Sequence, residues 1–409
     1  MLIEFTFDNF KCYRDEVTLQ MEAASIDEHD DTLINGVGSR SILPVSVIYG
    51  PNGGGKSSVL QALECLYDYV TLPYFVLRQR IKNFPKITCR PYAFEAESRS
   101  NPTTFCVLFD RGEYLYRYIL SVKEGRIEEE YLHRRKAGKG ATATIFERSG
   151  KDVELGSSLK RKRVNTDVDE MMPYLTFLKV NYDFDSVDDA FGWFLSCEFL
   201  DYSESRFENF FMEPKEDFEK QRIIGLLNAM DINITDIRYE HGKEDTLEGI
   251  YLTHNVGDGY ELELDEESNG TRKLLSLVPP ILVALAHGHL LVSDELDAKL
   301  HPKLLKYLIR LFADKKTNPK GAQLVITSHD MSTLNSSMFR RDEIWFAART
   351  PDGPSQLYSL ADIADSDGKR VRTGNAYDRQ YLAGRYGADP YLQNMLTWDE
   401  AKDAGDAHE

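Results

Sequence analysis

The sequence has few of the features that mark secreted, membrane-spanning or disulfide-stabilised proteins. It contains no run of about 18 apolar residues, the shortest stretch that reads as a membrane-spanning helix. Its opening segment, MLIEFTFDNF, lacks the basic start and apolar run of a signal peptide. Cysteine is scarce, odd in number and without a C-x-x-C pair, at Cys12, Cys65, Cys89, Cys106 and Cys197. We therefore expect a cytoplasmic protein with no membrane contact, no disulfide framework and no zinc site.

Basic charge is also in short supply. The formal net charge is -18, which argues against wholesale coating of nucleic acid because phosphate neutralisation needs a basic surface. The composition is otherwise that of a globular protein, with 42% hydrophobic and 28% charged residues. At 409 residues the chain has room for two or three domains, or for one large α/β domain with an insertion.

The first third of the chain predicts strands followed by one helix. Ile3, Phe5 and Phe7 alternate with polar residues and precede a second run at 17–21, a pattern typical of a β-hairpin. The apolar run LPVSVIY at 43–49 suits a strand that is buried on both faces. A glycine loop follows it, and then apolar residues recur at helical spacing up to Val70. The runs at 105–109 and 114–122 predict a β-meander.

The middle of the chain changes its charge abruptly. Residues 133–163 carry ten Lys or Arg against three acids, whereas residues 183–219 carry twelve acids, two bases and many aromatic residues. We interpret 133–235 as an inserted, partly helical arm or lid.

From residue 289 an alternation of strands and helices predicts a mainly parallel sheet covered by helices. The expected strands are HLLVS at 289–293, QLVIT at 323–327 and EIWFAA at 343–348. A helix should begin at Pro302, and a short helix should follow the second strand.

The glycine loop carries the clearest motif, because GPNGGGKS at 50–57 satisfies G-x-x-x-x-G-K-[ST] between a predicted strand and a predicted helix. Its glycines let backbone N–H groups wrap phosphates, Lys56 reaches the β- and γ-phosphate oxygens, and Ser57 ligates Mg²⁺. The predicted ATP contacts are Gly50, Pro51, Asn52, Gly53, Gly54, Gly55, Lys56, Ser57 and Ser58.

Two later strand ends supply the remaining chemistry. Asp294 and Glu295 follow a strand, where an acid in an open α/β sheet points into the nucleotide crevice. Asp294 would hold Mg²⁺, and Glu295 would take the proton of the attacking water as a general base. His329 ends the next strand and could hydrogen-bond the γ-phosphate through a neutral imidazole.

Together these motifs resemble a known family. GPNGGGKS, ESNGTRKLL at 267–275, VSDELDAKLHP at 292–302 and ITSHD at 326–330 are similar to the ABC-type ATPase heads of SMC, RecF and OLD proteins. Within that group the chain most resembles the AAA15/AAA21 ATPases of RloA or AbiLi type, found in bacterial anti-phage and abortive-infection loci. FTFDNFKCYRDE near the start and KRVRTGNAYDRQYLAGRYGADPYL near the end are similar too, so the resemblance covers both ends and skips the middle.

The resemblance implies an ABC-type P-loop NTPase head of α/β class, with an N-terminal β-meander, a central mixed or parallel sheet covered by helices, and an inserted α-rich arm or lid. It divides the chain into 1–132 with the phosphate loop, the insertion 133–235, a second lobe 236–365 and a tail 366–409. The lobe 236–365 would carry the signature, the paired acids, the D-loop and the switch histidine.

The resemblance also implies a composite site at the seam of a head-to-head homodimer or higher homo-oligomer. Ser268, Asn269 and Gly270 form a signature that would contact the γ-phosphate bound by another subunit, and Asp297 lies in the D-loop at 296–298. Asn269 departs from the two glycines that usually follow the serine. Pro279 and Pro280 predict a kink or break in the helix after the signature, and no Q-loop glutamine is assignable.

The same likeness places Phe10, Lys11 and Tyr13 near the base and phosphates of ATP. It implies that Tyr13 stacks on adenine, while Phe10 is expected in the core. His301, just before Pro302, is interpreted as a helix-start residue and not as a ligand.

Four functions fit these observations to different degrees. The first is an ATP-hydrolysing, Mg²⁺-dependent dimeric switch in bacterial defence or DNA maintenance, which controls a separate effector protein such as a Toprim-like nuclease. The second is an ATP-binding module with little turnover that scaffolds such a partner. The third is the ATPase subunit of a membrane transporter, in which the separation of Lys56 and Ser268 along the sequence would be shorter than the 212 residues found here (268 minus 56). An SMC-like tether would need a long heptad-repeat insertion or a zinc hook, and neither is present.

Basic residues outside the phosphate loop leave alternatives open. Arg134 to Lys139 and Lys160 to Arg163 could contact nucleic acid or an acidic partner, or could be a solvated loop or pair with the acids at 183–219. Lys369, Arg370 and Arg372 could equally fix the tail to the acidic core.

Overall fold

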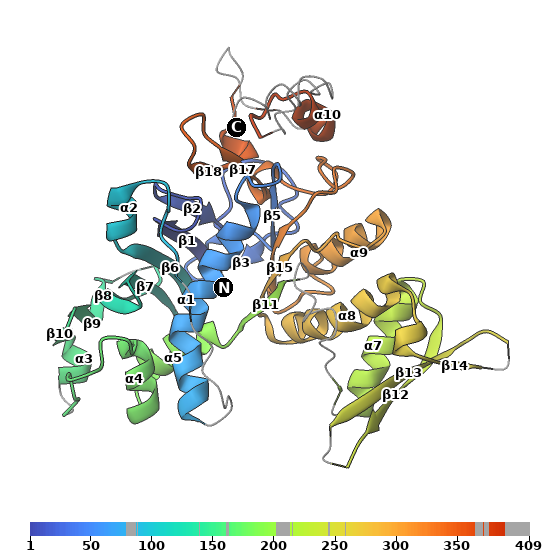
Figure 1. The fold of residues 1–409 in the computed structure, drawn as a ribbon, viewed down its shortest axis with the longest axis horizontal. Coiled ribbons are helices and arrows are strands. Elements are labelled where there is room, and N and C mark those ends of the chain that lie inside the picture. Colours follow the sequence, from blue (N-terminus) through green and yellow to red (C-terminus); the bar gives the residue numbers. More distant parts are fainter. Residues whose placement is uncertain are drawn as a thin grey trace, which may run out of the picture.

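The computed structural model describes residues 1–78, 87, 89–138, 140–160, 163–201, 213–214, 216–243, 246–257, 259–364, 371 and 376–388. Two large sheets lie against each other, and a smaller three-stranded sheet extends to one side (Figure 1).

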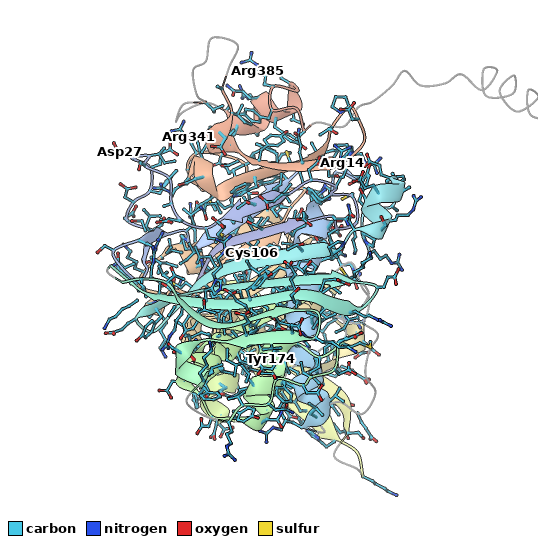
Figure 2. All side chains as sticks on the ribbon, turned by 90° about the vertical axis from the view of Figure 1, so that its left-hand side faces the viewer. Arg14, Asp27, Cys106, Tyr174, Arg341 and Arg385 are labelled. Atoms are coloured by element: carbon cyan, nitrogen blue, oxygen red, sulfur yellow. The ribbon has the colours of Figure 1, made fainter. Side chains whose placement is uncertain are left out.

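The first large sheet is antiparallel and contains the start of the chain. Its seven strands run in the order β10-β9-β8-β7-β6-β1-β2, and Figure 2 looks onto its outer face. The predicted hairpin is confirmed because β1 pairs with β2 antiparallel, and the predicted meander is confirmed in β6 and β7. The strands are β1 (Leu2–Asp8), β2 (Val17–Gln20), β6 (Thr103–Arg111), β7 (Tyr114–Lys123), β8 (Arg126–Lys136), β9 (Ala143–Ser149) and β10 (Asp152–Leu155).

The second large sheet is mainly parallel and has the order β11-β15-β16-β5-β17-β18. All of its pairs are parallel except the last, in which β18 runs antiparallel to β17. The expected strands at 43–49, 289–293, 323–327 and 343–348 are therefore confirmed. Their bounds are β5 (Val45–Tyr49), β11 (Cys197–Asp201), β15 (Leu290–Asp294), β16 (Gln323–Thr327), β17 (Ile344–Arg349) and β18 (Ser355–Ser359).

Both faces of the parallel sheet are buried, which explains its continuous apolar strands. Ile48 and Val325 point into a core shared with the antiparallel sheet and α1 (Lys56–Leu77). Their neighbours Val47 and Ile326 point into a second core. That core is covered by α8 (Asn269–His287) and α9 (Pro302–Ala313).

The remaining elements are small. A three-stranded antiparallel sheet of β12 (Ile234–His241), β13 (Leu247–His254) and β14 (Glu261–Glu263) contacts α7 (Asp217–Ala229). The other elements are β3 (Ile34–Asn35), β4 (Ser41–Ile42), α2 (Ala96–Ser100), α3 (Ser157–Lys160), α4 (Tyr174–Asn181), α5 (Asp185–Phe194), α10 (Tyr377–Leu382), and the 3-10 turns η1 (Leu264–Glu266), η2 (Arg341–Glu343) and η3 (Leu360–Asp362).

The structure corrects the predicted arm or lid over 133–235. Residues up to 155 continue the antiparallel sheet as β8, β9 and β10, and β11 joins the parallel sheet beside β15. These strands bury Leu132, Ile145 and Phe146 while Arg135 and Lys136 are exposed, so the segment is part of the packed sheet. In the described part of this segment, α3, α4, α5 and α7 supply the predicted helical character, and the other predicted segment boundaries stay predictions.

Two local expectations after residue 270 are also wrong, namely a break in the helix at Pro279 and Pro280 and a short helix after β16, whereas the kink expected as the alternative to a break stays a prediction. The helix α8 runs through Pro279 and Pro280 without a break, because the residues on both sides, Val278 and Ile281 among them, are held in the core. In place of the short helix after β16 the chain forms turns and then η2. In the described part of the chain, no helix is long and apolar enough to cross a membrane.

Candidate functional site

The loop between β5 and α1 has backbone geometry that requires glycine. Gly50, Gly53 and Gly55 have φ values of 149, 73 and 107°, a region that side-chain-bearing residues rarely adopt. A Cβ at Gly50 would lie 2.1 Å from the carbonyl oxygen of Ala347 on the neighbouring strand. The glycines of the motif are thus needed both for the turn and for its close approach to β17.

Lys56 begins α1 and folds back over this loop. Its ammonium donates to the carbonyl oxygens of Gly50, at 3.0 Å, and Pro51, at 3.1 Å. Burial lowers the pKa of Lys56, while the negative charges of Asp294, Glu295 and Asp297 act in the opposite direction. The lysine and the three carboxylates therefore share one electrostatic environment at the carboxyl edge of the parallel sheet.

The two adjacent acids are held by the neighbouring strand. Because β15 and β16 are parallel and in register from Leu290 with Gln323, their carboxyl ends meet. The Thr327 hydroxyl donates to Asp294 Oδ1 and accepts from the backbone N–H of Glu295 at 2.8 Å. Asp294 is 6% exposed, and Glu295 is half-buried with φ 49°. This hydroxyl fixes the positions of both acids.

The segment after Glu295 is tied both to the next strand end and to α8. Asp297 Oδ2 accepts from the backbone N–H of His329 at 2.9 Å, and its buried Oδ1 has no hydrogen-bond partner among the described residues. The buried Lys273 ammonium donates to the carbonyl oxygens of Glu295, Leu296 and Ala298. The imidazole of His329 is exposed at the rim of the same edge.

The signature residues stand apart from the phosphate loop of their own chain. The Ser268 hydroxyl caps α8 by accepting from Thr271 N at 3.1 Å, and a Cβ on Gly270 would lie 3.6 Å from Lys299 O. Within the described residues, no hydrogen bond or ion pair joins residues 268–270 to residues 50–58. The structure thus brings together the loop, Asp294, Glu295, Asp297 and His329, and it leaves Ser268, Asn269 and Gly270 for a separate contact.

Tyr13 is not available to stack on a base, which corrects the expectation drawn from the resemblance. Its side chain is fully buried, its ring packs edge-on against Phe7, and its hydroxyl donates to Gly55 O at 3.3 Å. Phe10 is buried, as expected. Lys11 donates to Gln61 Oε1 of α1 at 2.6 Å, and burial lowers the pKa of Lys11.

Three residues of the site were not singled out from the sequence. Thr327 and Lys273 lie inside the quoted motifs ITSHD and ESNGTRKLL, so the motifs contained them without indicating their roles. Arg349, at the end of β17, donates from Nε to Gly53 O at 3.0 Å. Only the pairing of β17 with β5 places it there, and no sequence pattern signals that pairing.

Four of the seven described Lys and Arg residues of 134–163 have structural partners. Arg148 is buried and donates to the carbonyl oxygens of Gly150, Met172 and Asp169. Lys136 pairs with Glu113, Lys151 pairs with Glu170, and Arg134 lies over the ring of Tyr114. The partners of these four residues are thus not acids of 183–219. Lys139, Arg161, Lys162, Lys369, Arg370 and Arg372 lie outside the described residues.

The predicted magnesium ligands, a carboxylate and a hydroxyl, are of the chemical types that Mg²⁺ binds. The described residues contain no cluster of three or more His, Cys, Asp or Glu that could hold a metal. Mg²⁺ is typically bound by one or two carboxylates together with substrate phosphates, which does not require such a cluster. The buried Asp294 and the hydroxyl of Ser57, at the first turn of α1, have that composition. His301 caps α9 by accepting from Lys303 N, as expected of a helix-start residue.

A glycine loop between a parallel strand and a helix, with an acid at the end of an adjacent strand, defines a P-loop ATPase. Residues 45–335 match the family model described as "AAA domain, putative AbiEii toxin, Type IV TA system". This match spans more than half of the chain, so the chain belongs to that family, and the recognition of an AAA21-type ATPase is confirmed.

Among solved structures, several SMC head domains are similar to this chain. The SMC head domain from Thermotoga maritima is 12% identical, with 88% of this chain and 98% of that chain covered at a TM-score of 0.39. An SMC head bound to the C-terminal winged-helix domain of ScpA is 13% identical, with 88% and 97% covered at a TM-score of 0.41. An SMC head from Pyrococcus furiosus bound to the C-terminal domain of ScpA is 15% identical, with 88% and 96% covered at a TM-score of 0.37. No curated protein matches the chain.

Proposed function

We propose that the chain binds and hydrolyses ATP as a dimeric, nucleotide-gated switch that controls a separate effector in bacterial defence or DNA maintenance. The observation that carries this proposal is the joint placement of Lys56, Asp294 and Glu295 at one sheet edge. The family description, with its reference to a toxin system, supports the defence setting.

Each residue has a role that follows from its position. The N–H groups of residues 50–58 would cradle the phosphates, and Lys56 would exchange its present carbonyl acceptors for phosphate oxygens. Ser57 and Asp294 are the residues that would hold Mg²⁺, an ion that neutralises charge on the β- and γ-phosphates when it is bound. The Thr327 bond keeps the Asp294 carboxylate oriented for that purpose.

Glu295 is the general base of the proposed reaction. Its backbone N–H donates to the Thr327 hydroxyl, and its own backbone carbonyl accepts from the Lys273 ammonium. The carboxylate therefore projects from a fixed backbone. It would accept a proton from a water molecule placed in line with the γ-phosphate. His329, exposed at the same edge, would contact the γ-phosphate and sense its loss.

The proposal of a dimer follows from the residues that one chain does not bring to its own ATP site. Residues 268–270 have no hydrogen bond to the phosphate loop within the described chain, so Ser268, Asn269 and Gly270 would complete the site of a second copy across a head-to-head seam. Asp297, with one buried and unpaired oxygen, lies beside that seam. Closure of the dimer around ATP would change the surface offered to the effector.

A binder with little turnover is the second candidate. It is favoured by the Ser268 hydroxyl, which is already hydrogen-bonded to Thr271 N and Thr271 Oγ1 within its own helix. A serine so occupied, followed by Asn269, has less freedom to bind a γ-phosphate.

Turnover and particle mass, measured with and without ATP and Mg²⁺, separate the two candidates. Wild type should hydrolyse ATP, and Glu295→Gln should lose hydrolysis while gaining mass in light scattering when ATP is added. Lys56→Ala should neither bind nor dimerise, which controls for effects unrelated to nucleotide. If wild type binds ATP without hydrolysis or change of mass, the passive binder is correct and the switch is wrong.

A further inference from the structure

Two of the cysteines, Cys65 and Cys89, lie in contact on the helix that follows the phosphate loop. Both thiols are free, they share a side-chain hydrogen bond, and they pack in the same core. Cys65 stands in α1, the helix that begins at Lys56, whereas Cys89 lies in a segment that is neither helix nor strand. The proposed ATP site uses neither thiol.

Hydrogen bonds of Lys11 hold the segment of Cys89 against α1. The backbone N–H of Lys11 donates to Arg90 O at 2.8 Å, next to Cys89 in the chain. The ammonium of Lys11 donates to Gln61 Oε1 at 2.6 Å. Gln61 precedes Cys65 by about one helical turn, so both side chains lie on one face of α1. This bridge explains why the two thiols meet.

The two thiols differ in exposure and in acidity. Cys65 is buried and donates the shared hydrogen bond, which raises its pKa together with burial. Cys89 is partly exposed. The hydrogen bond from Cys65 lowers the pKa of Cys89, Thr103 acts in the same direction, and burial opposes both. Because the thiolate is the reactive form of cysteine, Cys89 is the thiol that an oxidant attacks first, and Cys65 is placed to react with the product.

The other cysteines have partners of a different kind. Cys12 Sγ donates to Ser58 Oγ at 3.4 Å, Cys106 Sγ accepts from Arg117 Nε at 3.3 Å, and Cys197 Sγ donates to Trp193 O at 3.5 Å. In the described part of the chain, Cys65 and Cys89 are thus the cysteines that are joined thiol to thiol.

A bond between the two sulfurs would change the surroundings of Lys11. Cys65 is fixed in a helix, so the bond would draw Cys89 and the adjacent Arg90 carbonyl toward α1. Lys11 donates to that carbonyl and has φ 52°, a conformation that is uncommon for a residue with a side chain. Its backbone therefore depends on the contacts that hold it.

The residue after Lys11 contacts the phosphate loop directly. Cys12 Sγ bonds the Ser58 hydroxyl, and a Cβ placed on Gly55 would lie 3.0 Å from the same sulfur. Ser58 and Gly55 are both predicted ATP contacts. A displacement of residues 11 and 12 would therefore disturb the phosphate-binding loop.

We propose that Cys89 and Cys65 form a peroxide-sensitive thiol pair, and that their disulfide weakens the binding of ATP. Oxidation of the pair is a property of the two thiols, whereas its effect on ATP rests on the proposed function. In a reducing compartment, disulfides are typically transient and serve catalysis or sensing.

The oxidant is a hydroperoxide, of which hydrogen peroxide is the simplest. The Cys89 thiolate attacks one peroxide oxygen, the O–O bond breaks and hydroxide leaves, which gives a sulfenic acid on Cys89. The Cys65 sulfur then attacks the Cys89 sulfur and forms the S–S bond. The sulfenic oxygen leaves as water, which takes up the proton of the Cys65 thiol. The pair of thiols loses two electrons, and the peroxide gains them.

The first test is peptide mapping by mass spectrometry of the full chain, treated with hydrogen peroxide in the absence of nucleotide. We expect a disulfide between Cys65 and Cys89 that dithiothreitol reverses. In Cys65→Ser, Cys89 should accumulate as a sulfenic acid that dimedone captures. Cys106→Ser, which removes a buried cysteine elsewhere, should form the disulfide as wild type does. A wild type without this disulfide, or equal dimedone labelling of Cys89 and Cys106 in Cys65→Ser, would overturn the inference.

The second test compares oxidised and reduced wild type, so that it does not depend on the folding of a variant. Titration of a fluorescent ATP analogue should give a severalfold higher Kd for the oxidised protein, and dithiothreitol should restore the lower value. Cys89→Ser treated with the same peroxide should keep the Kd of the reduced protein. Equal Kd values for oxidised and reduced wild type, or an equal rise in Cys89→Ser, would overturn the link to the ATP site.

ATP turnover of the fully reduced protein tests the proposed function separately. A mapped disulfide without turnover in the reduced protein keeps the thiol pair and removes the proposed function. Turnover without the disulfide does the reverse. Thermal unfolding of each variant verifies that it is folded.

Discussion

At the scale of single residues, the acids of the ATP site are positioned by a neutral hydroxyl. Thr327 is fully buried and bridges Asp294 Oδ1 and the backbone N–H of Glu295. An acid held in this way keeps its charge available for a metal or a water, because its hydrogen-bond donor is a neutral hydroxyl. The bridge joins two parallel strands, so its loss affects both acids together.

Replacing Thr327 with valine keeps the shape and removes the hydroxyl. Because a buried carboxylate and an N–H lose their partner, we expect the free energy of unfolding to fall by about 1–3 kcal/mol. ATP turnover should fall more strongly than ATP affinity, since the acids act on the γ-phosphate and not on binding of the base. Denaturant titration and steady-state kinetics measure both effects. Thr327→Ser, which restores the hydroxyl, should recover turnover, and full turnover by the valine variant would show that the bridge is dispensable.

Arg349 gives a second prediction at this scale. Its guanidinium holds the carbonyl of Gly53, at the exposed tip of the phosphate loop. Without that bond the loop samples more conformations before ATP binds, so Arg349→Ala should raise the Kd for ATP by roughly threefold to tenfold. Titration of a fluorescent ATP analogue measures the change. Arg379→Ala, which removes an exposed arginine on α10, is the matched control, and an unchanged Kd for Arg349→Ala would remove the proposed role.

The residues named from the sequence were those with local motifs. The phosphate loop and the paired acids stand beside strand and helix patterns that identify them, and the structure places them together. Tyr13 was misassigned because a likeness in sequence does not report the direction of a side chain. Arg349 and Thr327 act through a neighbouring strand, and strand order is a property of the fold that no window of sequence contains.

At the scale of elements, η2 is a short turn held by buried charge. The Arg340 guanidinium bonds Asp342 Oδ1 at 2.9 Å and Asp30 Oδ1 at 2.7 Å, and Arg341 bonds Glu28 Oε1 at 2.7 Å. These bonds fasten the segment between β2 and β3 to the start of β17. Glu343 closes the turn by accepting from Arg340 N at 2.9 Å.

The buried Glu343 makes stability depend on pH. Burial raises the pKa of Glu343 to about 8 from an ordinary value of 4.5, so the folded protein keeps this proton where the unfolded chain releases it. The stability that Glu343 contributes to the folded state is complete below about pH 4.5. It is lost as pH rises through about 8, by at most roughly 1.4 kcal/mol of unfolding free energy for each pH unit. The unfolding free energy of wild type should therefore decline more steeply across this window than that of Glu343→Gln. Parallel curves for the two proteins would show that Glu343 ionises normally.

Helices and strands could be predicted where a single hydrophobic periodicity, or one continuous apolar run, extended through the whole element. β5, β15 and β16 read as buried strands because they are short, apolar and bounded by turns, and α1 and α9 show helical spacing. β8, β9 and β10 were missed because the count of basic residues over 133–163 drew attention away from the buried apolar residues of these strands, Leu132, Ile145 and Phe146 among them. The break expected in α8 did not occur, because the core holds the helix on both sides of its prolines.

At the scale of the whole molecule, the two large sheets are joined by contacts between residues far apart in the chain. The Gln323 side chain, at the start of β16, accepts from Leu2 N at 2.6 Å and donates to Leu2 O at 2.9 Å. A buried amide with both ends paired fixes the first strand of one sheet to the central strand of the other.

The proposed dimer makes one further prediction, which concerns how two copies share their sites. In a two-fold head-to-head dimer each site combines Lys56 of one chain with Ser268 of the other. Lys56→Ala and Ser268→Arg should each be inactive alone, because each spoils both sites of its own dimer. Mixed dimers contain one intact site, made by Lys56 of the Ser268→Arg chain and Ser268 of the Lys56→Ala chain. If sites act independently and half of the dimers are mixed, turnover should recover to roughly a quarter of wild type.

The measurement is ATP turnover over a series of mixing ratios, with differently tagged chains to count the mixed dimers. Ser268→Ala, which loses the cap of α8 without adding bulk, controls for damage to the helix. Recovery that follows the number of mixed dimers places the signature of one chain on the nucleotide of the other. An inactive mixture in which mixed dimers do form would exclude independent composite sites, because each such dimer holds one complete set of the residues they need.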